Sequence, residues 1–134
     1  MTLDLEPRRS LAVVDVPERC GNAPRKAVVR DFAIALASKN VSEVTGLLKP
    51  DVEWTVNGGQ TLSGTTEVGE WIAAQADARE LKINTVITHG TECGVDGALT
   101  LVDGTTVAFA HILRFTGGAK TARISEVRSY VVPH

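Results

Sequence analysis

The chain has 134 residues, about the length of one compact domain, and can bury a substantial core without disulfides or a metal. Its 14 Lys and Arg residues nearly balance its 16 Asp and Glu residues, so it offers no strongly basic surface to nucleic acid or to an anionic membrane. No run of apolar residues approaches the roughly 20 that cross a bilayer. We therefore expect neither nucleic acid nor membrane as a partner.

Residues 1–23 lack the periodicity of the rest of the chain. Pro7, Pro17 and Gly21 interrupt them, and Leu11 to Val16 is the one stretch that favours a short extra strand. We interpret residues 1–23 as an N-terminal extension, with that strand lying along the surface of a domain that spans residues 24–134.

The two cysteines, Cys20 and Cys93, stand far apart and belong to no ligand-spaced cluster. Free thiols in a reducing compartment are the expected state. Because the N-terminal segment also lacks the apolar core of a secretory signal, we expect a cytoplasmic protein.

Helical spacing of apolar residues begins at Pro24. It predicts a first helix that is capped by Asn22 and ends near Lys39, and a second, shorter helix that is capped by Asn40 and ended by Pro50. A third helix is expected after Gly64. The apolar positions that carry the three patterns are Val28, Phe32, Ala35 and Leu36; Val41, Val44, Leu47 and Leu48; and Val68, Trp71 and Ile72.

Alternating residues predict the strands. One strand is expected at 51–57, followed by a Gly58-Gly59 turn and an irregular stretch at 60–63. Four longer strands are expected at 81–89, 92–101, 105–115 and 121–132. Their short links favour an antiparallel meander. The order of elements indicates an α+β domain in which three N-terminal helices pack on the concave face of a curved, mixed or antiparallel sheet, with space for a cavity between the layers.

His111 is the most informative single residue. Strand alternation aligns it with Val107, Phe109, Leu113 and Phe115, so a titratable imidazole lies on an apolar face that helices must cover. This pattern favours a residue that lines a pocket. The alternative is a core histidine that is satisfied by a serine or a backbone carbonyl and kept neutral by burial.

Several other residues are candidates for the same site. Ser125 and Ser129, on the neighbouring strand, could give hydroxyl partners to His111 or to a ligand, or could simply be small residues that permit close packing. Trp54 and Trp71 are expected as cavity walls or core, and Asn57 as a polar group near the mouth or a turn residue. Asp96 is expected as an acid or base or, with Gly97, as a turn or bulge residue. The other face of the last strand, with Ile124, Glu126, Arg128 and Tyr130, is expected to be either solvated or a partner surface.

These motifs, over about residues 24–132, resemble the nuclear transport factor 2-like superfamily and in particular its SnoaL-like branch. The stretches that carry the resemblance are the first two helices at 28–36 and 40–48, the strand 51–58 with 62–64, and the strands 109–115 and 124–130. The resemblance implies a cone-shaped α+β barrel. It also implies a homodimer formed through the outer face of the sheet.

The catalytic patterns of that superfamily match this chain only in part. In the ketosteroid isomerase pattern, the proton-shuttling Asp corresponds to Val56 or Asn57, the Tyr to Phe32 and the second Asp to His111, and two of these three positions lack the needed chemistry. In the epoxide hydrolase pattern, Ser129 replaces an Asp, while Asp96 remains as a possible acid or base.

Polyketide cyclases of this type place a His or Asp on the inner strands, and His111 meets that requirement. Near its reference pKa of about 6.5 it could exchange a proton with a ligand. The resemblance thus implies a protein that binds a hydrophobic metabolite in a pocket lined by Phe32, Phe109 and the candidates above, with cofactor-independent isomerisation, cyclisation or hydration chemistry at His111. The alternative is a non-catalytic ligand-binding or dimeric interaction module. No cofactor is expected, and the dispersed histidines predict no metal site.

Overall fold

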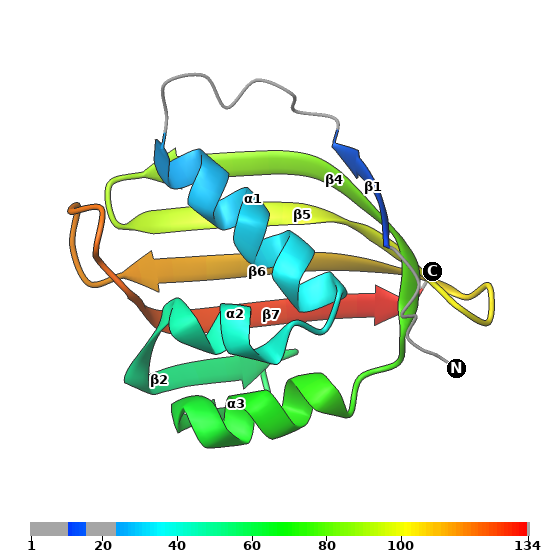
Figure 1. Ribbon diagram of the computed structural model, residues 1–134, viewed down its shortest axis with the longest axis horizontal. Helices are drawn as coiled ribbons and strands as arrows, with labels where there is room; N and C mark the ends of the chain where they lie inside the picture. Colours follow the sequence, from blue (N-terminus) through cyan, green and yellow to red (C-terminus); the bar gives the residue numbers. More distant parts are fainter. Residues whose placement is uncertain (1–10, 16–23, 134) are drawn as a thin grey trace, which may run out of the picture.

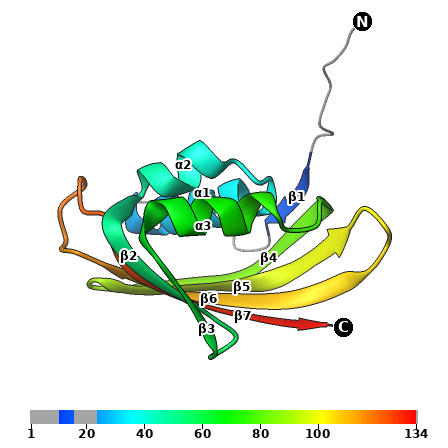
Figure 2. The same ribbon diagram turned by 90° about the horizontal axis from the view of Figure 1, so that it is seen from below.

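The computed structural model describes residues 11–15 and 24–133. Within them, three helices form one layer over one face of a curved seven-stranded sheet (Figures 1 and 2). The elements are β1 (Ala12–Asp15), α1 (Pro24–Ala37), α2 (Val41–Gly46), β2 (Leu48–Val56), β3 (Gln60–Ser63), α3 (Gly64–Ala73), β4 (Ala78–His89), β5 (Glu92–Leu101), β6 (Thr106–Phe115) and β7 (Ile124–Pro133). The predicted α+β class, with helices on the concave face, is confirmed.

The sheet is mixed, and its strand order is β1-β4-β5-β6-β7-β2-β3. Strands β4 to β7 form the predicted antiparallel meander, while β2 joins β7 and β1 joins β4 in parallel. Because β1 and β3 are its two edges, the described sheet stays open and does not close into the barrel that the family resemblance implied.

Part of the predicted N-terminal extension can be placed. β1 lies within the predicted stretch from Leu11 to Val16 and extends the sheet beside β4. The remainder of the extension, including Asn22 as a helix cap and the thiol of Cys20, lies outside the described residues, as does His134.

The predicted starts of two long strands are each wrong by three residues, since β4 begins at Ala78 and β7 at Ile124. The larger errors lie around β2. The second helix ends at Gly46, and Pro50 lies inside β2 instead of ending a helix. The ladder with β7 is interrupted between Leu48 and Glu53, so the missing N–H of Pro50 costs no hydrogen bond to β7. The stretch expected to be irregular is β3, joined to β2 by a turn in which Asn57 and Gly58 have positive φ angles of 53° and 73°.

Gly97 has a specific role in the curvature of the sheet. It lies opposite a register irregularity in β4 between Ile83 and Thr85, and a Cβ atom at Gly97 would collide with the carbonyl oxygen of Lys82. The missing side chain therefore allows β4 and β5 to approach closely at this irregularity, where strands bend and twist most readily. The curved profile of the sheet is visible in Figure 2.

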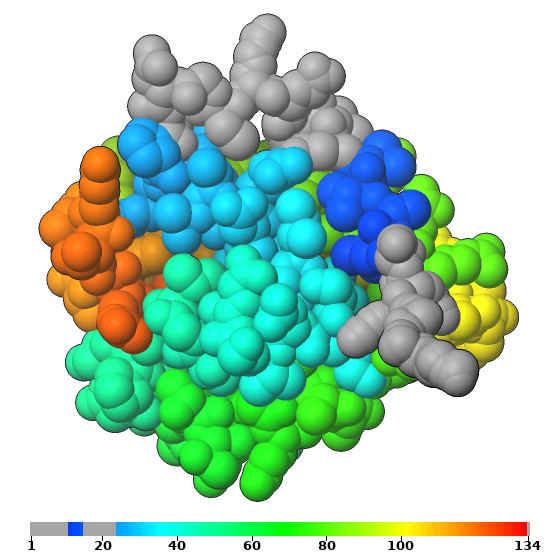
Figure 3. Space-filling view, in the orientation of Figure 1, coloured from blue at the N-terminus to red at the C-terminus, as the bar shows by residue number. Residues whose placement is uncertain are grey.

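The interface between α1 and the sheet has two contrasting ends. We call the end near the N-terminus of α1 the filled end, because large side chains there are fully buried: Val29, Phe32, Val44, Leu113, Ile124 and Val127. Arg25 seals it, with its guanidinium 4.0 Å from the centroid of the Phe115 ring and Nη2 donating to the carbonyl of Gly117 at 3.1 Å. The opposite end, under the C-terminal turn of α1, is the hollow end. The helices cover the concave face across both ends (Figure 3).

Candidate functional site

The hollow end contains a cavity of about 200 Å³. Its walls come from α1, the end of α3, the segment after it, and strands β4 to β7, and they are mostly apolar: Ala33, Leu36, Ala37, Lys39, Trp71, Gln75, Ala76, Ala78, Leu81, Leu99, Leu101, Val107, Phe109, His111 and Val131. Four alanines are among them, so short side chains leave the space that large side chains occupy at the filled end.

His111 lies at the boundary between the two ends. It comes from the middle of β6, is 5% exposed and lines the cavity. The ring of Phe109 stacks on the imidazole with centroids 5.1 Å apart, and the ring of Phe32 meets it edge-on at 5.9 Å. Two aromatic rings therefore fix the plane of the imidazole.

Ser129 joins His111 to Trp54. Its Oγ lies 2.7 Å from Nδ1 of His111 and accepts a hydrogen bond of 2.8 Å from Nε1 of Trp54. Ser129 and Trp54 are both fully buried. The three residues come from the adjacent strands β6, β7 and β2, and form a hydrogen-bonded chain beneath the cavity, which we call the Trp54–Ser129–His111 relay.

Burial lowers the pKa of His111 to about 4. The imidazole is therefore neutral at physiological pH, and the expected proton exchange near pKa 6.5 does not match this environment. The structure combines features of both interpretations of the sequence: His111 lines a cavity, and it is also a buried histidine with a serine partner.

The other predicted aromatic residues divide into walls and supports. Trp71 and Phe109 line the cavity. Phe32 and Trp54 have no exposed surface and lie behind the imidazole, in contact with each other at 5.7 Å between ring centroids. Their positions favour a supporting role.

Asn57 connects strands. Its Oδ1 accepts a hydrogen bond of 2.7 Å from the N–H of Val131, and its own N–H donates to the carbonyl of Ser129. Asn57 thus fastens the end of β2 to β7 beside the relay, and it is absent from the walls of the cavity.

Two further candidates lie away from the cavity. Ser125 occupies a register irregularity, where its Oγ donates to the carbonyl of Arg114 at 3.2 Å. The extra residue turns Ile124 into the core, so the predicted position of Ile124 on the outer face of the sheet is wrong. In β5, Asp96 follows Val95, the cross-strand partner of His111, and alternation places its side chain on the opposite face of the sheet. Its Oδ1 is buried and has no hydrogen-bond partner among the described residues.

Lys39 was missed by the sequence analysis. It lines the cavity, and its Nζ crosses the rim to donate to the carbonyl of Gln75 at 2.8 Å and to Oδ1 of Asp77 at 2.9 Å. The backbone of Lys39 has a φ of 59°, which is uncommon for a lysine. No pattern in the sequence signals this turn, because Gly or Asn is the usual marker of such a conformation.

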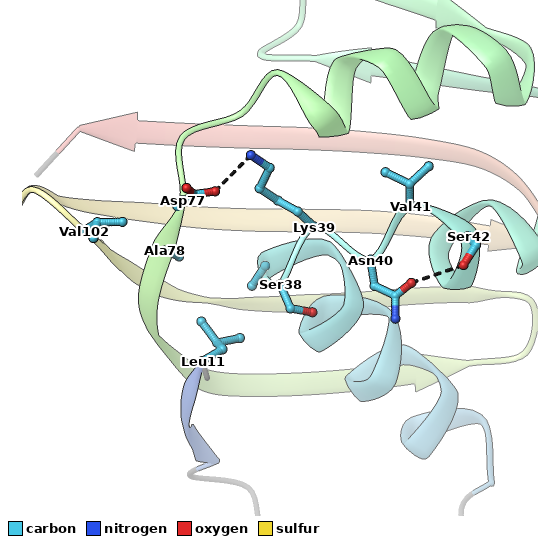
Figure 4. A pocket seen from close by; sticks show the side chains of 10 residues that line it. Leu11, Ser38, Lys39, Asn40, Val41, Ser42, Asp77, Ala78 and Val102 are labelled. Atoms are coloured by element: carbon cyan, nitrogen blue, oxygen red, sulfur yellow. Dashed lines mark hydrogen bonds and ion pairs between the residues drawn. The ribbon is translucent and has the colours of Figure 1, made fainter. Parts of the chain in front are cut away.

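A larger, open groove of about 910 Å³ lies on the outer side of Lys39 (Figure 4). Its walls are Leu11, Ala37, Ser38, Lys39, Asn40, Val41, Ser42, Asp77, Ala78 and Val102. Ala37, Lys39 and Ala78 line both spaces, so the outer groove adjoins the cavity at the side of the ion pair between Lys39 and Asp77.

Residues 11–15 and 24–133 contain neither a cluster of metal ligands nor a membrane-spanning helix. No three His, Cys, Asp or Glu side chains there gather closely enough to hold a metal ion. None of the helices in this part of the chain has the length and apolar character needed to cross a membrane.

The chain matches one family model in sequence and resembles several solved structures in fold. The family model described as "SnoaL-like domain" matches residues 29–126. Among curated protein sequences, none matches the chain.

Three solved structures illustrate the fold. An NTF2-like protein of unknown function from Burkholderia xenovorans LB400 has a TM-score of 0.71 at 9% identity, covering 85% of this chain and 87% of its own. A candidate ketosteroid isomerase from Kribbella flavida DSM 17836 has a TM-score of 0.67 at 18% identity, covering 81% and 77%. An NTF2-like protein of unknown function from Burkholderia pseudomallei K96243 has a TM-score of 0.62 at 27% identity, covering 80% and 89%.

Proposed function

The chain belongs to the SnoaL-like domain family, and we propose that it binds a small hydrophobic metabolite in the cavity beside His111. The observation that carries this proposal is a single buried imidazole on the wall of an otherwise mostly apolar cavity of about 200 Å³. Apolar walls with a few convergent polar groups are the usual character of small-molecule sites. The volume suits a compact ligand, below the size of most drug-like molecules.

The polar groups around the cavity support a role for His111 in orienting that ligand. Gln75 donates from Nε2 to the carbonyl of Trp71 at 2.9 Å, and Lys39 is engaged at the rim by Asp77. The ammonium of Lys39 and one N–H of the Gln75 amide are thus already engaged. The polar group of the ligand is proposed to contact the imidazole of His111, the buried polar side chain on this wall.

If the protein is an enzyme, we propose cofactor-independent chemistry of the isomerisation, cyclisation or hydration type, with His111 as the catalytic residue. The lowered pKa makes it a neutral hydrogen-bonding group and a weak base. The alternative is a non-catalytic ligand-binding or dimeric interaction module. The position of Asp96 on the opposite face of the sheet from His111 favours this alternative, because it removes the one carboxylate that the family patterns had left to the site.

The test is a thermal-shift screen of small hydrophobic metabolites, in which the cavity is closed by substitution. Ala33 is a buried wall residue, so Ala33→Leu should fill the space, whereas Ala73→Leu changes an exposed residue at the end of α3 and is the matched control. Compounds that bind the cavity should raise the Tm of the wild type and of Ala73→Leu, but not that of Ala33→Leu. Equal shifts in all three proteins would place binding elsewhere and contradict the proposal.

We also propose a homodimer through the outer face of the sheet. Ile87 and Ile112 lie in one cross-strand row on that face, which Arg128 continues on β7. Tyr130 follows Arg128 on the same face of β7, and Val132 lies one position further along it. The two isoleucines, Tyr130 and Val132 are all exposed, Ile87 by 60% and Val132 by 58%. An exposed apolar group of this kind is typical of an interaction surface.

Light scattering during size-exclusion chromatography tests the dimer. We expect Ile112→Asp to give a monomer, because a charge would be buried in the interface. Val102→Asp is the control, since Val102 is an exposed apolar residue at the β5–β6 turn and lies outside the outer face. A monomeric wild type would refute this proposal without affecting ligand binding.

A cytoplasmic location is consistent with the buried cysteine. Cys93 is a free thiol in the core, and burial raises its pKa, which keeps it in the unreactive thiol form. We propose the cytoplasm on this ground together with the absence of a metal-ligand or disulfide pattern in the sequence. Fractionation of cells that express the protein at natural levels would test it.

A further inference from the structure

We infer that His111 presents its Nε2–H to the cavity as a hydrogen-bond donor, and that the ligand is a neutral, mostly apolar molecule with a carbonyl-type acceptor. The inference rests on the proposed function and names the ligand class of the same cavity. It is carried by the proton positions that the buried Trp54–Ser129–His111 relay permits.

The direction of the relay follows from counting donors and acceptors. The indole N–H of Trp54 can only donate, so it occupies one lone pair of Ser129 Oγ. The hydroxyl hydrogen of Ser129 then needs an acceptor. Among the described residues, the one other hydrogen-bond partner of this Oγ is Nδ1 of His111, at 2.7 Å.

The reverse arrangement would leave a buried donor without a partner. If Nδ1 carried the hydrogen and donated to Ser129, the hydroxyl would accept two hydrogen bonds and its own hydrogen would have no acceptor in a fully buried position. An unsatisfied buried donor is costly enough to decide between two tautomers of similar intrinsic stability. Nδ1 is therefore the acceptor.

The second ring nitrogen must then carry the hydrogen. Burial lowers the pKa of His111 well below physiological pH, and a neutral imidazole has one N–H, which is at Nε2. No hydrogen bond from Nε2 occurs within the described residues, although His111 lines the cavity. A ligand that offers an acceptor to Nε2–H would satisfy this donor.

The walls select the rest of the ligand. An anionic acceptor would lose its hydration against Leu99, Val107 and Val131, while the nearest cation, Lys39, is engaged by Asp77 at the rim. An ammonium or amide N–H of a ligand at the same place could not bond to Nε2–H, because both groups are hydrogen-bond donors. A ketone or ester carbonyl fits both constraints, and Nε2–H would polarise it as a neutral hydrogen-bond donor without removing a proton.

The first measurement needs no ligand. In the full-length chain labelled with 15N, long-range 1H–15N NMR correlations identify which ring nitrogen of His111 carries the proton, with the His111 signals assigned by their loss in His111→Phe. We expect Nε2–H in the wild type and a mixture of tautomers in Ser129→Ala. An Nδ1–H tautomer in the wild type would overturn the inference and leave the proposed function standing.

The second measurement compares three probes of one size, 1-indanone, indane and protonated 1-aminoindane, by NMR titration. We expect 1-indanone to bind about tenfold more tightly than indane, as one added hydrogen bond predicts, and 1-aminoindane to bind worst. His111→Phe should remove the preference for the ketone. Equal binding of ketone and hydrocarbon, or tighter binding of the amine, would overturn the inference but not the proposed function. Binding of none of the three would refute the proposed function and the ligand class together.

Discussion

The filled end and the hollow end of the α1–sheet interface are made from the same layers but differ in side-chain size. At the filled end, Phe32, Leu113 and Ile124 have no exposed surface, and Arg25 lies over the ring of Phe115. At the hollow end, the helical positions that face the sheet are short residues such as Ala33 and Ala37. The backbone architecture alone does not create the cavity; the alanines determine where it lies.

The largest expected effect is a loss of stability that differs between the two ends. Leu113→Ala removes a fully buried side chain from the filled end and should lower the free energy of unfolding by about 2–5 kcal/mol. Leu101→Ala, in a partly exposed wall of the hollow end, should cost about 1 kcal/mol, because part of the lost contact is already absent. Urea denaturation measures both. Equal losses would mean that the hollow end is packed like the filled end.

Acid should destabilise the protein through His111, at the boundary of the two ends. The pKa is about 4 in the folded state against about 6.5 when unfolded, so between these values the unfolded chain binds more protons. Stability is therefore full above pH 6.5, declines as the pH falls toward 4, and loses about 3 kcal/mol in total. In His111→Gln this part of the pH dependence should disappear from denaturation curves, while the contribution of carboxylates remains. An unchanged profile would contradict the buried, neutral state of His111.

Much of the fold was predictable because its signals are local. The bounds of β5 follow from strict alternation between two turns, and the start of α1 from Pro24 and helical spacing. The boundaries of β2 and β3 failed for a non-local reason. Pro50 ends helices in most contexts, but here it occupies a gap in the ladder with β7 that only the tertiary pairing creates.

The site was predictable only where the alternation of side chains along a strand determines which face of the sheet a residue occupies. Alternation placed His111, Phe109 and Ser129 on one face, and the structure brings them together. Parity failed at Ser125, because one extra residue in β7 shifts the register, and such a bulge leaves no sign in the sequence. The rim formed by Lys39 depends on its contact with Asp77, which is distant in sequence, and a single sequence does not indicate such contacts.

A smaller effect is expected from the relay. Ser129→Ala should lower the free energy of unfolding by about 1–3 kcal/mol, because it leaves the indole N–H of Trp54 buried without an acceptor. Ser125→Ala is the matched control on the same strand. Its Oγ hydrogen bond is exposed, so this substitution should cost less than about 0.5 kcal/mol. Similar losses in the two variants, measured by denaturation, would show that the relay adds nothing to stability.

The smallest expected effect on stability comes from Lys39 at the hollow end, compared with Arg25 at the filled end. Lys39→Met should change the free energy of unfolding by less than about 1 kcal/mol, because its ion pair with Asp77 is solvated, with side chains 26% and 71% exposed, and methionine retains the apolar stem. Arg25→Met should cost more, since Arg25 contacts the Phe115 ring and donates to two backbone carbonyls. Lys39→Met should instead speed ligand exchange, measured by NMR line shapes with 1-indanone, because the rim loses its closure. If Lys39→Met destabilised the chain as much as Arg25→Met and left exchange unchanged, Lys39 would be a structural anchor, and the hollow end would be closed by other means.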